Sequence, residues 1–210
     1  ENGGCVDTDS TAFYSQGSYQ LDEKWSLTLG GRYTKDDKDA SVYRYVYSGY
    51  KFPRQTGGTR IGVQTDFTDS ASFSHFSPRA GVEYQYSRDL MLYGSYTNGF
   101  KSGGFDMRAN QSINPDADEP YQEETVDTFE LGMKSEWLDQ RLRVNAAVFM
   151  SSYDDMQVTV QRSVELNGAV TVASQVLNAA NADINGAEIE ATFAATRDLN
   201  LSLILGYVDA

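Results

Sequence analysis

Apolar and polar residues alternate along much of this chain with a period of two. In the clearest run, Trp25, Leu27 and Leu29 fall on one side, whereas Thr28 and Arg32 fall on the other. Successive side chains of a β-strand point to opposite faces of a sheet. The pattern therefore predicts a strand that has one apolar face and one polar face.

Similar runs recur along the chain and predict an all-β protein with about eight strands. The expected strands cover residues 11–21, 25–35, 77–86, 90–100, 128–137, 142–160, 187–193 and 199–208. Short polar turns join them in pairs at residues 22–24, 87–89, 139–141 and 196–198. Longer polar segments separate the pairs, at residues 36–74, 101–126 and 161–177. Short turns that alternate with long loops are typical of an antiparallel up-and-down transmembrane β-barrel, whose long loops are extracellular.

The longer segments carry signals of their own. Asn167-Gly168 lies between two β-branched runs, and this dipeptide favours a type I′ turn, so we expect a hairpin that projects from the barrel rim. Within the first long segment, residues 42–47 are a candidate hairpin arm. We otherwise expect that segment to be a loop, and a loop of this length is usually functional or disordered.

The two faces of the expected strands suit two different surroundings. One face is apolar and would contact lipid; it carries Leu27, Leu29, Val82, Leu131, Val144, Val148, Ile189, Leu201 and Leu203. Aromatic residues near the strand ends of that face resemble the girdles of a membrane barrel: Trp25, Tyr33, Tyr84, Tyr86, Trp137 and Tyr207. The other face would line the lumen and carries Arg32, Arg79, Glu83, Glu130, Lys134, Glu188 and Glu190. These charges could form cross-strand ion pairs that stiffen the wall or hold a plug, or could touch substrate; we favour the ion pairs.

Composition narrows the class of protein. The chain has 210 residues, enough for one domain, and its 17 basic and 30 acidic residues give a formal net charge of −13. We expect no nucleic-acid partner, because such binding needs a basic face. No run approaches 18 apolar residues, so we expect no transmembrane helix. Cys5 is the single cysteine and excludes a disulfide within the chain; whether it pairs elsewhere stays open.

Candidate catalytic chemistry is sparse. His75 is the single histidine, and Ser74 or Ser77 with Asp69 could complete a nucleophile-base set. Serine and aspartate are so abundant here that such a set arises easily by chance. We therefore interpret His75 as a loop or strand-end histidine and expect no catalytic residue, no cofactor and no enzyme.

One segment has the spacing of the first half of an EF-hand calcium loop. Asn181, Asp183, Asn185 and Gly186 match it, but Thr192 stands where that loop needs a bidentate glutamate. We interpret the segment as a turn and expect no metal site.

Six motifs, in order along the chain, resemble part of the β-barrel of TonB-dependent outer-membrane receptors. They lie at residues 27–34 (LTLGGRYT), 77–84 (SPRAGVEY), 92–105 (LYGSYTNGFKSGGF), 129–134 (FELGMK), 144–149 (VNAAVF) and 185–190 (NGAEIE). The resemblance implies a bacterial outer-membrane receptor and transporter whose long loops bind a scarce nutrient. Iron-siderophore complexes are the common substrate class, and a TonB-type partner supplies the energy. The sequence alone identifies neither the substrate nor the residues that bind it.

The barrel of that family has about 22 strands around a plugged lumen. The resemblance therefore implies that residues 1–210 form a partial β-barrel domain, without the plug and the closing strands. In that case residues 11–21 and 199–208 would be the two edges of the sheet. Three alternatives stay open: a small complete eight-stranded barrel with a structural or adhesive role, an outer-membrane hydrolase, and a soluble β-sandwich.

Overall fold

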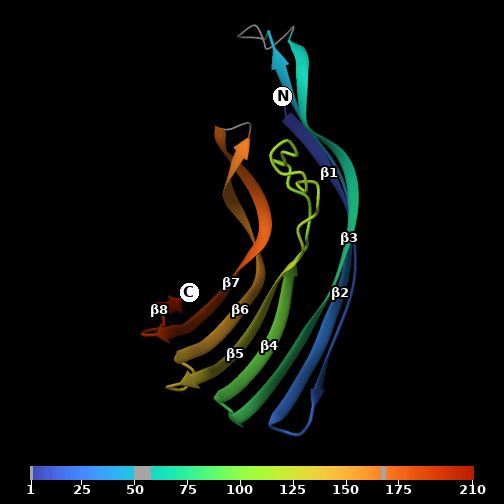
Figure 1. Cartoon of the computed structure of the whole chain (residues 1–210). Helices are drawn as coiled ribbons and strands as arrows, with labels where there is room; N and C mark the ends of the chain where they lie inside the picture. The colour runs from blue at the N-terminus through green and yellow to red at the C-terminus, as the bar shows by residue number, and fades with distance from the viewer. Residues whose placement is uncertain (1, 50–57, 167–168) are drawn as a thin grey trace.

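Eight antiparallel strands form one curved sheet in the computed structural model, which describes residues 2–49, 58–166 and 169–210 (Figure 1). The strands are β1 (Asn2–Gln20), β2 (Trp25–Ser48), β3 (Thr59–Ser87), β4 (Leu90–Lys101), β5 (Glu124–Trp137), β6 (Leu142–Leu166), β7 (Ala169–Ala194) and β8 (Asn200–Asp209). Each strand pairs with the next one in sequence, which confirms the predicted all-β, up-and-down arrangement. Among the described residues, no helix is long and apolar enough to cross a membrane.

The four predicted short turns connect β1 to β2, β3 to β4, β5 to β6 and β7 to β8, as expected. Because consecutive strands are antiparallel, these turns all lie at one end of the sheet, below the long segments in Figure 1. In the first turn the Asp22 carboxylate accepts hydrogen bonds from the backbone N–H groups of Lys24 and Trp25, at 2.7 and 2.8 Å. These two bonds hold the pKa of Asp22 below its usual value.

The prediction of a loop over residues 36–74 is wrong. Most of that segment is strand, because β2 continues to Ser48, β3 begins at Thr59, and Asp36 pairs with Phe73. The acidic residues near position 36 indicated a loop. However, a strand that extends out of the membrane can be polar on the face that contacts water. The acidic run therefore does not end the strand. Residues 50–57 lie outside the described residues.

The third long segment, residues 161–177, forms the hairpin that the sequence predicts. β6 and β7 pair as far as Leu166 and Ala169, which leaves two residues for the connection. The predicted type I′ turn at residues 167–168 lies outside the described residues. The turn predicted at residues 181–186 is wrong, because those residues lie within β7.

The pairing register confirms the predicted apolar face. Leu27 pairs with Val82 and Leu131 pairs with Val148, while Gly94 of β4 joins the two pairs. Directly paired residues share a face of the sheet, so this line of residues marks the lipid-facing surface. The register also assigns the faces of β4, because Tyr93 pairs with the lumen-facing Glu83. Tyr93 faces the lumen.

Aromatic side chains mark both limits of the apolar face. Trp25 and Trp137 lie beside the short turns, and Tyr33 and Phe76 lie farther along β2 and β3, all on the exposed outer face. The stretch of β2 from Trp25 to Tyr33 has the length, about 9–11 residues, that a strand needs to cross a bilayer. We take this band as the membrane-spanning part. The segments of β2 and β3 beyond Tyr33 and Phe76 lie outside it.

The two edge strands do not pair with each other. β1 pairs with β2 alone and β8 with β7 alone, as expected for a segment of a wider barrel. The small closed eight-stranded barrel is therefore not formed. No second sheet packs on the apolar face of the described strands, so the β-sandwich is not formed either.

Candidate functional site

Beyond the membrane band, the sheet divides into two walls. The pairing of β3 with β4 ends at Arg79 and Thr97, while β3 continues with β2 alone. On the other side, β6 and β7 extend together as a long hairpin. Residues 102–123, which connect β4 to β5, lie between the two walls in Figure 1. We call this segment the strap.

The strap packs on the inner face of β2 and β3. Ala109 of the strap is buried against Val42 of β2. The Thr65 hydroxyl donates to the backbone oxygen of Ala109 at 2.9 Å, and Lys38 Nζ donates to the backbone oxygen of Gly103 at 2.5 Å. These contacts explain why the buried apolar residues among the described ones lie in the strap and in the part of the sheet beyond the membrane band.

Gly103 lies so close to the wall that no side chain fits there. A Cβ atom on Gly103 would lie 2.3 Å from Cε1 of Phe73 and 2.3 Å from the backbone oxygen of Tyr121. Position 103 therefore requires glycine, because the backbone there lies too close to its neighbours for any side chain.

The strap is also bound to β6 and β7. The buried Asp106 carboxylate accepts a hydrogen bond from the Val176 N–H of β7 at 2.8 Å. Asn178 of β7 accepts from the Gln122 N–H at 2.7 Å. Gln157 of β6 donates to the backbone oxygen of Gln122 at 3.0 Å. The strap thus joins two walls that are not neighbours in the sheet.

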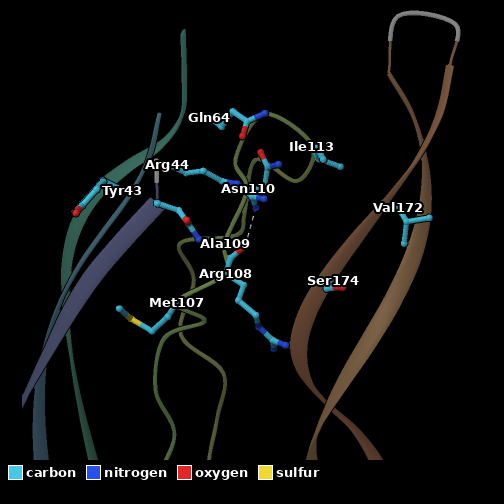
Figure 2. A pocket seen from close by; sticks show the side chains of 11 residues that line it. Tyr43, Arg44, Gln64, Met107, Arg108, Ala109, Asn110, Ile113, Val172 and Ser174 are labelled. Carbon is cyan, nitrogen blue, oxygen red and sulfur yellow. Dashed lines mark hydrogen bonds between the residues drawn. The ribbon is translucent and has the colours of Figure 1, made fainter. Parts of the chain in front are cut away.

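A cavity of about 450 Å³ lies between the strap and both walls (Figure 2). Its volume falls in the range of small-molecule sites, roughly 300–1,000 Å³. We call it the vestibule. It is lined by Asn2, Tyr43, Arg44, Gln64, Met107, Arg108, Ala109, Asn110, Ile113, Val172 and Ser174.

The vestibule contains two guanidinium groups. Arg108 Nε lies 3.1 Å from Asp106 Oδ1, and its NH2 group donates to the Thr159 hydroxyl at 3.2 Å. Arg44 NH1 donates to the backbone oxygen of Arg108 at 3.5 Å, and Arg44 forms no ion pair among the described residues. The Asp106 carboxylate offsets the charge of Arg108, so the guanidinium of Arg44 is the group that favours an anionic ligand in the vestibule.

A second polar cleft of about 440 Å³ lies lower on the lumen wall. Arg79, Glu83, Glu130 and Lys134 line it, and the Tyr93 hydroxyl donates to Glu130 at 2.7 Å. Its charges belong to the set for which we predicted cross-strand ion pairs.

That prediction is wrong. Within the described part of the chain, no ion pair involves Arg32, Arg79, Glu83, Glu130, Lys134, Glu188 or Glu190. The register gives the reason, because neutral residues lie directly opposite these charges. Glu130, for example, pairs with Ser95 and Phe149.

His75 lies within β3, not in a loop or at a strand end as we predicted. Its ring contacts Glu123 and Asn98, and none of its hydrogen bonds involves Ser74, Ser77 or Asp69. The nucleophile-base set is therefore not assembled. Cys5 lies exposed on β1, opposite Ser41.

Sequence reasoning placed ligand binding in the long loops but identified no residue. Arg44 and Arg108 belong to two of those segments and are 64 positions apart. A single arginine in a polar segment carries no signal of its own. Only the two walls and the strap bring the two groups to one cavity.

Known proteins resemble this chain in sequence over most of its length. Residues 2–210 match a family model described as TonB dependent receptor-like, beta-barrel. The ferric-pyoverdine 358 receptor of Pseudomonas putida is 25% identical over 185 residues, which cover 88% of this chain and 19% of that receptor. The ferric-pyoverdine M114 receptor PbuA of Pseudomonas sp. strain M114 is 26% identical over 209 residues, which cover 98% of this chain and 22% of that receptor.

Solved structures share the fold. The ferric yersiniabactin uptake receptor FyuA of Yersinia pestis superposes with a TM-score of 0.69 at 19% identity, over 98% of this chain and 28% of that one. The chain therefore spans about a fifth of the length of the two curated relatives, and its sheet corresponds to part of a wider barrel.

Proposed function

The chain belongs to the TonB-dependent receptor-like β-barrel family, and on that premise we propose that it forms part of a receptor that imports a ferric siderophore. Members of this family are outer-membrane β-barrels of bacteria, and they are receptors and transporters, not enzymes. In this role, the lipid-facing strands would cross the outer membrane and the long outer segments would face the ligand. The outer-membrane hydrolase is set aside.

One observation carries the proposal beyond family membership: two guanidinium groups line a cavity between the strap and the walls. Both curated relatives are named ferric-pyoverdine receptors. Arg44 and Arg108 would bind negatively charged oxygen atoms of such a chelate, because arginine pairs with carboxylates in a planar geometry. Met107, Ile113 and Val172 add apolar surface for an organic scaffold.

Binding measurements on the purified receptor test this role, with ferric pyoverdine as the probe and quenching of tryptophan fluorescence as the readout. Arg44→Gln and Arg108→Gln should each raise the Kd roughly tenfold to a hundredfold, since a hydrogen bond between charged groups contributes about 1.5–3 kcal/mol. Arg197→Gln is the matched control, because Arg197 is exposed in the turn between β7 and β8, at the opposite end of the sheet. Unchanged affinity in both vestibule variants would contradict the site.

We also propose that a TonB-type partner energises import, through a plug region that fills the lumen. Because the chain covers about a fifth of its relatives, binding and transport belong to the whole receptor. Uptake of ⁵⁵Fe-labelled ferric pyoverdine into cells with and without TonB tests this step. Binding should persist without TonB while uptake stops; equal uptake in both strains would contradict it.

A further inference from the structure

The ring of His75 lies where β3 separates from β4. Its Nδ1 atom is 3.0 Å from Oε1 of Glu123, the last residue of the strap. Its Nε2 atom is 2.7 Å from Oδ1 of Asn98 in β4. The ring also stacks on Phe100, with centroids 4.5 Å apart and planes at 15°. His75 therefore connects three elements at the base of the gap between the walls, with a side chain that is only 13% exposed.

The hydrogen bonds around the ring determine its protonation. Asn98 Nδ2 donates to Asp127 Oδ1 at 2.8 Å, so the amide is oriented with its oxygen towards His75. The Tyr96 hydroxyl donates to the same Asp127 oxygen at 2.6 Å and fixes the carboxylate. Both groups that face the ring nitrogens, the amide oxygen of Asn98 and the carboxylate of Glu123, are acceptors.

A neutral imidazole has a single N–H group and can satisfy only one of two acceptors. In its neutral form, His75 would direct a nitrogen lone pair at an oxygen lone pair at one of the two contacts. The imidazolium form has two N–H groups and satisfies both. The face of Phe100 also attracts a cation.

The charges near the ring act in both directions. Burial lowers the pKa of His75, but the hydrogen bonds to Asn98 and Glu123 and the negative charges of Glu123 and Asp127 outweigh it, so the pKa lies above its usual value. On β2, Thr34 pairs with His75 and accepts a hydrogen bond from Arg32, which adds one opposing positive charge nearby.

We propose that protonated His75 is a clasp that holds the end of the strap against β3 and β4, so that docking of the strap depends on pH. The proposal rests on the contacts of the strap and is independent of the identity of the ligand. The clasp is fully formed below about pH 6.5, the ordinary pKa of histidine. It is lost as the pH rises through the higher pKa of the docked state, since one proton then leaves the ring. Alkaline conditions therefore loosen the strap at its Glu123 end, and mildly acidic conditions hold that end in place.

Hydrogen–deuterium exchange of the whole receptor in liposomes, from pH 6 to pH 8.5 and corrected for intrinsic exchange, tests the clasp. In the wild type, the opening equilibrium of residues 102–123 should rise by up to about tenfold per pH unit above pH 7, as expected for the loss of one proton. His75→Gln keeps a polar side chain that cannot gain charge, so it should remove this dependence. Glu123→Gln removes the nearby negative charge and should move the transition to lower pH.

Exchange in the turn between β5 and β6 serves as the internal reference. Mobility on gels of unheated and heated samples reports whether each variant has folded. A strap whose corrected exchange is independent of pH in the wild type would overturn the proposal. So would a folded His75→Gln variant that retains the wild-type dependence.

Discussion

Replacing Val148 with arginine should destabilise the receptor in its membrane far more than replacing the adjacent Ala147. Val148 lies on the lipid-facing line opposite Leu131, and the residue is 53% exposed. An arginine near the bilayer midplane costs about 2–4 kcal/mol. This is a change of roughly 30-fold to 700-fold in the folding equilibrium. Little packing is lost with the valine itself, because its outer side contacts lipid, so the cost measures burial of the charge.

Ala147→Arg is the matched variant, because it adds the same group one residue away on the opposite face. Ala147 pairs with Glu188 of β7, so the new arginine faces the lumen and an opposite charge. Such a cross-strand pair contributes about 0.2–1 kcal/mol and offsets part of any steric cost. Urea titration of both variants refolded into lipid vesicles, followed by tryptophan fluorescence, gives the two free energies of unfolding. Equal losses would refute the assignment of the two faces.

Two further substitutions test the strap. Gly103→Ala should loosen it by about 1–3 kcal/mol, because the new methyl group would overlap Phe73; Gly206→Ala, whose site has no atoms within 4 Å, is the control, and hydrogen exchange of the strap is the measurement. Asp106→Ala leaves the half-buried Val176 N–H without its acceptor and should cost about 1–3 kcal/mol, seen as faster exchange of that amide; an unchanged rate would show that the bond does not hold the strap.

The membrane-spanning half of the fold could be predicted from the sequence because each strand there has two different environments. Between Trp25 and Tyr33, lipid on one side and the lumen on the other impose strict alternation on the residues. Beyond Tyr33 this contrast weakens, since water covers the outer side. Ala40 and Val42 are nevertheless buried, because the strap lies on their face. The sequence near them does not indicate that a segment more than 60 residues away provides this cover.

The candidate site was less predictable for the same reason. Arg44 and Arg108 come together through long-range contacts, and no local pattern identifies either. The protonation of His75 likewise depends on the orientation of the Asn98 amide, which Asp127 fixes from another strand. A single sequence indicates which segments reach the outer surface, but not which of their side chains come into contact there.

The attachment of the strap to both walls restricts how the proposed vestibule can be transferred between related receptors. A segment that contacted one wall alone could be exchanged between related receptors as a module. Here the backbone of the strap forms hydrogen bonds with the side chain of Thr65 on one wall and with that of Asn178 on the other. A chimaera that received residues 102–123 alone would therefore carry one side of the proposed vestibule without its two supports. Transfer of the proposed vestibule requires the strap and its partner positions on β3 and β7 to be transplanted as one unit.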